Sequence, residues 1–158
     1  DDKPDVVLIM LGHNDSRSWS DCEFKEPDIT TEVQEAAYMK LINRIKESSP
    51  NTKIVLLSNV STYLPIQEEN AAKAKAKGIK HCIYGLPQYM EGFNDVLKKI
   101  AEKEKLDFVD LYNPTKADPD RKSLFLPDGV HLSPRGNQVV AELILRNLAE
   151  RRILDGRP

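Results

Sequence analysis

The sequence predicts an α/β fold, a three-layer sandwich in which a parallel sheet is covered by helices on both faces. Short runs of apolar and β-branched residues alternate with longer segments of helical periodicity along the chain. Asp5–Leu11 is apolar at nearly every position, as in a strand that is buried on both faces. The order strand, helix, repeated through residues 1–158, is typical of right-handed βαβ units in a single domain.

The first half of the chain supplies two strands and one clear helix. Asp5–Leu11 is expected to be a strand that ends at Gly12, and the polar stretch Ser16–Pro27 is expected to be a loop. A helix should start near Thr30 or Thr31 and end before Pro50. Thr31 and Gln34 resemble its capping box. Its apolar stripe is expected at Val33, Ala37, Leu41 and Ile45, flanked by Tyr38 and Ile42. Lys53–Ser58 is the next buried strand.

The second half continues the alternation. Ala71–Lys80, rich in Ala and Lys, is expected to be a solvated helix. Asp107–Leu111 is the third strand, and Ser133 and Pro134 are expected to cap and start the last helix. The two amphipathic helices of this half are marked by Phe93, Val96, Leu97, Ile100 and Ala101, and by Val140, Leu143, Ile144 and Leu148.

Composition excludes several function classes. The formal net charge is -2 with 30% charged residues, so no basic excess points to nucleic acid. No apolar run approaches the roughly 18 residues that cross a bilayer, and no signal peptide is visible before the first strand. Cys22 and Cys82 stand outside any C-x-x-C context and could be paired or free, so the compartment stays open. No cluster at ligand spacing predicts a metal or a cofactor.

Two polar motifs follow strands and should meet at one edge of the sheet. Gly12–Asp15 comes at the end of the first strand, and Asp128–His131 precedes the last helix. In open α/β sheets, sites form beyond the carboxyl ends of the strands. We therefore expect both motifs to face the same site.

Each motif has a catalytic and a purely structural interpretation. Asp128 could fix the His131 ring through its Nδ1–H group and leave Nε2 free to accept a proton, or it could simply cap a turn beside a surface histidine. Asn14 could donate to a developing oxyanion while Gly12 lets substrate approach the backbone, or the four residues could form an ordinary turn.

Together the motifs resemble those of the GDSL/SGNH ester hydrolases. Leu11-Gly12-His13-Asn14-Asp15 is similar to the G-x-N-D block, and Asp128-Gly129-Val130-His131 with Leu132-Ser133-Pro134-Arg135-Gly136 is similar to the D-x-x-H block. The resemblance covers essentially the whole chain and implies the flavodoxin-like fold of that superfamily. It implies that Asn14 and Gly12 line the oxyanion hole, that His131 is general base and then acid, and that Asp128 orients it.

The resemblance also suggests substrate-binding residues. Asp15-Ser16 followed by Trp19 resembles the carbohydrate acetylesterase branch, which implies that Trp19 stacks on a sugar face. A Trp packed against its own loop is the alternative. His13 stands where the family usually has Thr and is expected to shape the pocket, unless its role is structural.

The family's Gly-Asp-Ser block and its second glycine block are absent from the 158 residues. Ser16, Ser18, Ser20 and Ser58 lack a strand-to-helix nucleophile turn. We therefore expect a C-terminal portion of a hydrolase domain whose serine comes from a missing N-terminal segment or another chain. Asp5–Leu11 is too apolar for an exposed edge strand, so a complementing chain or a homo-oligomer across that edge is expected.

The expected function is hydrolysis of a small-molecule or glycan ester, most readily an acetyl group on a carbohydrate, with no metal or cofactor and with the isolated chain inactive. The alternative is a non-catalytic relative that binds a glycan or a protein. No G-x-G-x-x-G or G-x-x-x-x-G-K-[ST] motif supports a nucleotide role.

Overall fold

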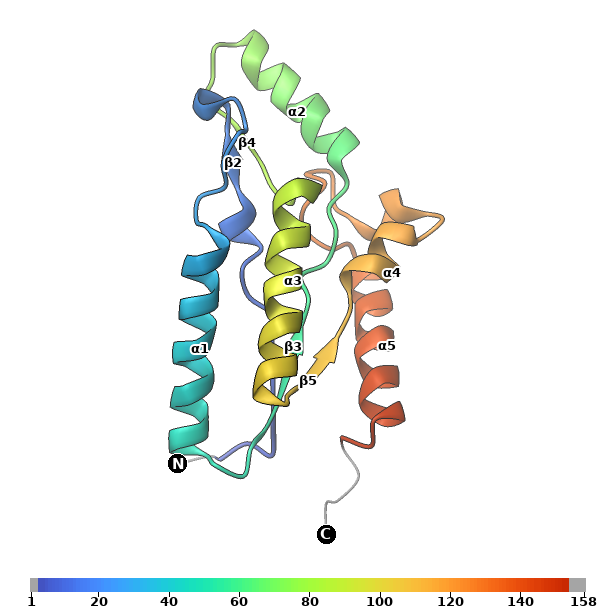
Figure 1. Ribbon diagram of the computed structural model, residues 1–158. Helices are drawn as coiled ribbons and strands as arrows, with labels where there is room; N and C mark the ends of the chain where they lie inside the picture. Colours follow the sequence, from blue (N-terminus) through green and yellow to red (C-terminus); the bar gives the residue numbers. More distant parts are fainter. Residues whose placement is uncertain (1–2, 154–158) are drawn as a thin grey trace.

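A parallel sheet forms the centre of the molecule. The computed structural model describes residues 3–153 (Figure 1). Strands β1 (Val6–Ile9), β3 (Lys53–Leu57) and β5 (Asp107–Val109) pair in parallel, in the order β1-β3-β5. Leu8 lies opposite Val55, and Leu56 lies opposite Phe108. The three predicted strands and their parallel pairing are confirmed.

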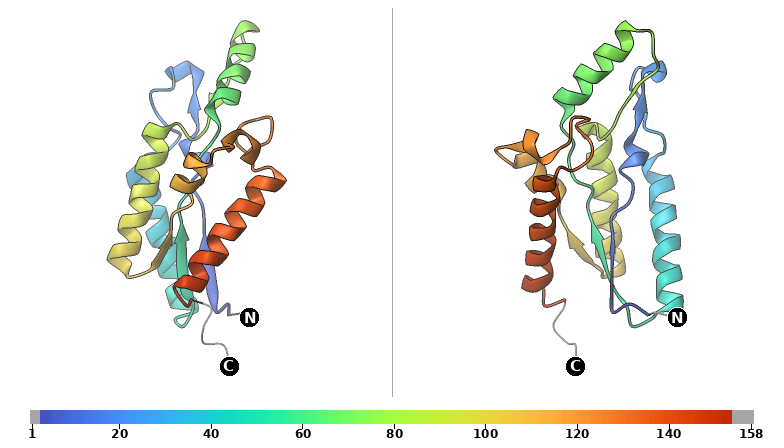
Figure 2. Two further views of the ribbon diagram at one scale, coloured as in Figure 1. Left: turned by 90° about the vertical axis from the view of Figure 1, so that its right-hand side faces the viewer. Right: turned by 180° about the vertical axis from the view of Figure 1, so that it is seen from behind.

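Helices cover both faces of this sheet, as predicted. Helices α1 (Thr31–Ser48) and α3 (Pro87–Glu104) lie on one face, and α5 (Pro134–Glu150) lies on the other (Figure 2). Alternate side chains of β3 point to opposite faces of the sheet and pack in the two hydrophobic cores. Ile54 and Leu56 join the core formed with α1 and α3, and Val55 and Leu57 join the core formed with α5. The continuous apolar run that predicted this strand therefore reflects burial on both faces.

The last helix begins where the sequence predicts. Ser133 is the N-cap residue and its hydroxyl accepts a hydrogen bond from the Gly136 N–H group at 3.1 Å, with Pro134 in the first turn. A Cβ atom on Gly136 would lie 2.1 Å from the Leu124 carbonyl oxygen. Glycine is therefore required for α5 to start against the preceding segment.

The first helix differs from expectation at its cap and in its buried face. Thr30, and not Thr31, caps α1 by accepting from the Val33 N–H group at 3.4 Å, so the predicted capping box is wrong. The buried face is Gln34, Tyr38 and Ile42, whereas Val33 is 53% exposed. This face of α1 is buried because the helix packs against the polar residues at the end of β1. The Tyr38 hydroxyl accepts from the Leu11 N–H group at 2.9 Å and donates to the Leu11 carbonyl at 2.8 Å.

The stretch predicted as a plain loop, Ser16–Pro27, contains structure. After a 3-10 turn at Asn14–Ser16, strand β2 (Ser18–Trp19) pairs antiparallel with β4 (Cys82–Ile83), and a further 3-10 turn covers Ser20–Cys22. A two-residue ladder with a partner more than sixty positions away leaves no periodicity in the sequence.

Helix α2 (Leu64–Ala76) starts earlier and ends earlier than the predicted Ala71–Lys80. Pro65 sits in its first turn, where a missing N–H group costs nothing. Short helical pieces also follow β5, namely α4 (Tyr112–Ala117) and a 3-10 turn at Arg121–Leu124. Figure 1 shows α2, β2 and β4 standing beyond the carboxyl ends of the sheet.

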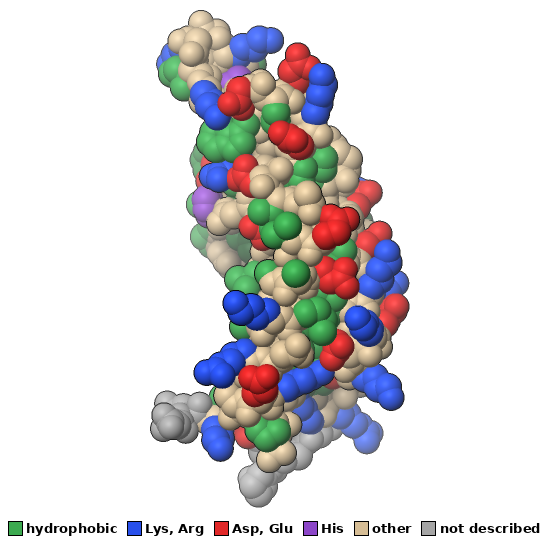
Figure 3. Space-filling model, turned by 60° about the vertical axis from the view of Figure 1, so that its left-hand side comes forward, with side chains coloured by type: hydrophobic (Ala, Val, Ile, Leu, Met, Phe, Trp, Pro, Cys, Tyr) green, Lys and Arg blue, Asp and Glu red, His purple; other side chains and the backbone are tan. Residues whose placement is uncertain are grey.

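The far edge of β1 has no partner strand among residues 3–153. Next to it, Leu8, Met10 and Leu11 are 42%, 41% and 56% exposed. The expected open apolar edge is thus present. Elsewhere acidic and basic side chains lie interspersed over the face drawn in Figure 3. None of the helices in the described part of the chain is long and apolar enough to span a membrane.

Candidate active site

The fold brings the two polar motifs together, as predicted. Asn14, Asp128 and His131 line one cavity of about 350 Å³ at the carboxyl end of the sheet. The other side chains that line it come from the Asp128–His131 motif, from α2 and from the segment around β4. They are Val130, Gln67, Asn70, Ala71, His81, Cys82 and Tyr84.

Asp128 and His131 form a hydrogen-bonded pair. The His131 Nδ1 atom lies 2.7 Å from Asp128 Oδ2, while Asp128 Oδ1 accepts from the N–H groups of Val130 at 2.8 Å and His131 at 2.9 Å. Burial acts to raise the Asp128 pKa, but the hydrogen bonds from Val130 and His131 outweigh it and lower that pKa. The carboxylate therefore stays ionised, favours the tautomer with hydrogen on Nδ1, and leaves Nε2 as a base.

A glycine holds this loop against the body of the protein. Gly129 has φ +73°, and a Cβ atom there would lie 2.6 Å from the Tyr63 carbonyl oxygen. The Tyr63 N–H group donates to the Gly129 carbonyl at 2.8 Å. The Asp128–His131 turn is therefore positioned by the segment between β3 and α2, with no room for a side chain between them.

Asn14 lies on a turn that hydrogen bonds of Ser16 hold in place. The Ser16 hydroxyl donates to the His13 carbonyl at 2.6 Å and accepts from the Gly85 N–H group at 2.9 Å. Within residues 3–153 the Asn14 side-chain amide makes no hydrogen bond and is free to donate into the cavity. Gly12 does not line the cavity. It has φ +105°, and a Cβ atom there would be 2.6 Å from Gln34 Nε2, so it packs directly on α1.

His13 is not among the residues that line this cavity. Its Nε2 atom is buried without a hydrogen-bond partner in the described structure. Burial, helped by the charge of His131, lowers the pKa of His13 to about 4. The ring is therefore neutral at pH 7, and its sequence-based role in the pocket stays a prediction.

Two cations lie over the ring of Trp19. The Arg17 guanidinium lies 4.8 Å and the Lys80 Nζ 4.5 Å from the ring centroid, and the indole N–H group donates to Asp28 Oδ1 at 2.9 Å. Trp19 is not among the residues that line the cavity of His131. The structure places it outside that cavity, packed against Arg17, Asp28 and Lys80.

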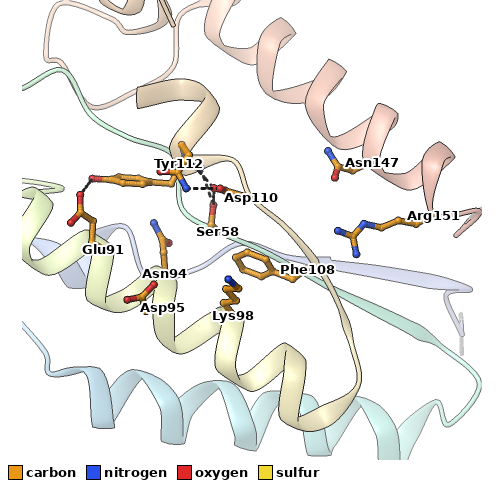
Figure 4. Close-up of a pocket in the computed structure, with 11 residues that line it drawn as sticks. Ser58, Glu91, Asn94, Asp95, Lys98, Phe108, Asp110, Tyr112, Asn147 and Arg151 are labelled. Atoms are coloured by element: carbon orange, nitrogen blue, oxygen red, sulfur yellow. Dashed lines mark hydrogen bonds between the residues drawn. The ribbon is translucent and has the colours of Figure 1, made fainter. Parts of the chain in front are cut away.

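None of the four serines weighed from the sequence lines the cavity of His131. Ser58 lies in a separate cavity of about 480 Å³ beside Asp110 and Tyr112 (Figure 4). Its hydroxyl accepts from the N–H groups of Leu111 at 2.8 Å and Tyr112 at 3.0 Å, so it ties β3 to the end of β5.

Sequence reasoning missed the contribution of α2 and β4. The Gln67 side chain donates through Nε2 to the Tyr84 carbonyl at 3.0 Å and accepts at Oε1 from the Tyr84 N–H group at 2.8 Å, which fastens α2 to the segment of β4. Only the tertiary pairing of β2 with β4 could have revealed this wall. Cys82 lines the cavity, and both Cys82 and Cys22 are free thiols. The described residues contain no group of three His, Cys, Asp or Glu side chains that could hold a metal ion.

With the geometry in place, comparison with known proteins identifies the family. Residues 1–139 match the GDSL-like Lipase/Acylhydrolase family, and the chain belongs to it. It is similar to the GDSL esterase/lipase WDL1 of Oryza sativa subsp. japonica, with 26% identity over 148 residues, which covers 94% of this chain and 55% of the relative. A GDSL esterase/lipase of Arabidopsis thaliana, At5g45920, is 28% identical over 154 residues and is covered to 60%.

Solved structures share the fold. The lipase/acylhydrolase from Enterococcus faecalis superposes with a TM-score of 0.68 at 19% identity, covering 94% of this chain and 63% of that one. A carbohydrate esterase family 3 protein from Talaromyces cellulolyticus superposes with a TM-score of 0.67 at 18% identity, covering 98% and 61%. The chain thus spans somewhat more than half the length of the relatives it matches.

Proposed function

We infer that this chain carries the base and an oxyanion donor of a serine ester hydrolase, whose nucleophilic serine comes from a segment or chain outside these 158 residues. The observation that carries the proposal is the 350 Å³ cavity in which Asn14 meets a His131–Asp128 pair bonded at 2.7 Å. The His131 side chain is 76% exposed, which leaves its Nε2 edge open to such a segment.

The reaction would run in two acyl-transfer steps. The serine hydroxyl attacks the ester carbonyl while His131 Nε2 accepts its proton, and the Asn14 amide stabilises the tetrahedral oxyanion. His131 then donates that proton to the leaving alcohol oxygen as the ester C–O bond breaks. Water, deprotonated by the same nitrogen, hydrolyses the acyl-enzyme and restores the serine, while Asp128 keeps the ring oriented throughout.

We further propose that the substrate is an O-acetylated carbohydrate. The likeness in fold to a carbohydrate esterase family 3 protein supports this choice. The wall of the cavity supports it too, because Asn70 and Tyr84 offer an amide and an aromatic side chain beside the small Ala71. The competing proposal, a binding protein without catalysis, is favoured only by the absence of a Gly-Asp-Ser block from the printed sequence.

The test compares the full-length gene product with this chain alone, using p-nitrophenyl acetate and an acetylated xylo-oligosaccharide. We expect turnover only in the full-length protein, blocked by phenylmethylsulfonyl fluoride. In that protein His131→Ala should lower kcat by about 10³-fold or more, and Asn14→Ala by about 10²–10³-fold. Asn43→Ala, which changes an exposed asparagine of α1, is the matched control and should leave kcat unchanged.

The two proposals separate clearly in this assay. Full-length protein that is inactive on both esters, but still binds the oligosaccharide, would favour the non-catalytic binding protein. Turnover by this chain alone that is lost in His131→Ala would mean that a nucleophile lies within the 158 residues. Faster hydrolysis of p-nitrophenyl butyrate than of either acetate would contradict the acetyl preference.

A further inference from the structure

His81 stands between two hollows at the top of the molecule. On one side it lines the cavity that contains His131, and on the other it lines a second hollow of about 540 Å³. The second hollow is bounded by the turn after β2 and by the segment that follows α2. Because His81 lines both, the two hollows are neighbours on either side of one residue.

Contacts of its backbone and of its ring hold His81 in place. The backbone of His81 is anchored to Ser20, whose N–H group donates to the His81 carbonyl at 2.9 Å and whose hydroxyl accepts from the His81 N–H group at 3.2 Å. Its Nδ1 atom lies 3.0 Å from the Ile79 carbonyl, and its ring packs against Phe24 with centroids 5.7 Å apart and planes tilted by 48°. The position of His81 between the two hollows is therefore set by the pairing of these loops.

The second hollow is lined by both apolar and charged side chains. The apolar ones are Phe24 and Ile79, and Ile79 is 55% exposed although it is a large aliphatic residue. Among the charged ones, Lys80 is paired with Asp21 at 2.7 Å, whereas Lys75 makes no ion pair within the described part of the chain. An alkyl chain would need apolar walls throughout. A pyranose ring instead offers C–H faces to the apolar side chains and hydroxyl groups to the charged ones.

We propose that this hollow is a second carbohydrate subsite, which holds the sugar ring that follows the one bound beside His131. The proposal rests on the carbohydrate substrate argued under "Proposed function" and assigns the direction of the glycan chain, from His131 past His81 toward Ile79. The enzyme would then prefer an oligosaccharide to a single sugar, because only a chain fills both hollows.

The chain carries its own reporter for this subsite. Trp19 is the single tryptophan, and the Lys80 Nζ that lies 4.5 Å from its ring centroid belongs to a residue lining the hollow. Titration of the full-length protein and of this chain with xylotetraose and with xylose, followed by tryptophan fluorescence and by calorimetry, measures binding without hydrolysis. Additional tryptophans of the full-length protein are replaced by phenylalanine for the fluorescence measurement.

We expect xylotetraose to bind about tenfold or more tightly than xylose. Ile79→Ser should weaken xylotetraose binding about fivefold without affecting xylose. Val33→Ser is the matched control, since Val33 is 53% exposed on α1 outside both hollows, and it should leave both affinities unchanged.

Equal affinity for the two sugars, or xylotetraose binding that is insensitive to Ile79→Ser, overturns the subsite. Binding of 1-octanol with the same Ile79 dependence and without sugar binding assigns the hollow to an alkyl chain and also overturns it. If the sugar-binding test fails but the full-length protein hydrolyses esters, only the subsite proposal is contradicted. Oligosaccharide binding that depends on Ile79 in a protein without esterase activity keeps the subsite and removes the catalytic proposal.

Discussion

At the scale of single residues, His13 has an environment that its sequence context does not reveal. It lies two positions after the end of the apolar run, next to Gly12 and Asn14, yet its Nε2 atom is buried without a partner. A neutral imidazole tolerates that position far better than a charged one. Because the folded protein holds this imidazole in its neutral form, the stability of the fold should depend on pH.

We predict that His13 destabilises the fold in acid. Its folded pKa of about 4 lies below the ordinary value of 6.5, so between these values the unfolded chain binds the proton and the native state does not. Stability is thus retained above about pH 6.5 and falls as the pH drops toward 4, by about 3 kcal/mol at most. Urea unfolding at pH 7, 6 and 5 should show that the stability of His13→Thr relative to the wild type improves as the pH falls.

A second histidine variant, His81→Asn, provides the comparison for this experiment. If the stability difference between His13→Thr and the wild type stayed constant from pH 7 to pH 5, the ring would have to be protonated in the folded protein. The buried position of Nε2 would then be wrong.

At the scale of elements, the site depends on close approaches between loops more than on the helices themselves. The Asp128–His131 turn touches the segment after β3 through Gly129, and the Asn14 turn touches the segment after β4 through Ser16 and Gly85. Both contacts join stretches far apart in sequence. The geometry of the candidate site therefore depends on how these loops pack against each other.

Two glycines allow this docking to be measured. Gly129 and Gly78 both have positive φ, +73° and +66°, but a Cβ atom on Gly129 would meet the Tyr63 carbonyl whereas one on Gly78 would meet nothing within 4 Å. Gly78→Ala should cost about 1–2 kcal/mol, the backbone strain alone. Gly129→Ala should cost about 3 kcal/mol or more, because Tyr63 or the turn must also move.

Chemical denaturation of the two variants gives the comparison. Gly129→Ala should also weaken hydrolysis in the full-length protein, since it displaces His131. Equal destabilisation by the two substitutions would mean that the contact between Gly129 and Tyr63 carries no energy.

At the scale of the whole molecule, the sheet is asymmetric. Its β1 edge combines unpaired backbone with exposed Leu8 and Met10, while acidic and basic side chains alternate over the face in Figure 3. Edge strands without charge or proline are templates for further pairing. Whatever covers this edge, another segment or another copy, would gain both backbone hydrogen bonds and apolar burial.

We therefore predict that this chain alone self-associates through the β1 edge. Sedimentation velocity should detect concentration-dependent association, and the double substitution Leu8→Lys, Met10→Lys should make the protein monomeric by placing charge beside that edge. Val33→Lys, at an equally exposed apolar position on α1, should leave the association intact. A wild-type chain that stays monomeric at high concentration would show that the edge is protected in solution.

The amino-acid sequence alone predicted the layers of the fold and the meeting of the two polar motifs. Apolar runs identified all three strands of the central sheet because each strand contributes side chains to both hydrophobic cores, and the Ser133-Pro134 cap fixed the start of α5. The G-x-N-D and D-x-x-H patterns placed Asn14 and His131 at one edge because parallel strands share their direction.

Only the tertiary structure decided the buried face of α1, the pairing of β2 with β4, and the wall formed by α2. Gln34 replaced the expected stripe residue Val33 because α1 packs beside the polar end of β1, where Gly12 leaves room for an amide. Trp19 and Cys82 meet across a two-residue ladder that is set by long-range contacts and has no local signal. Local patterns encode burial and caps, whereas the shape of a pocket depends on which distant loops come into contact.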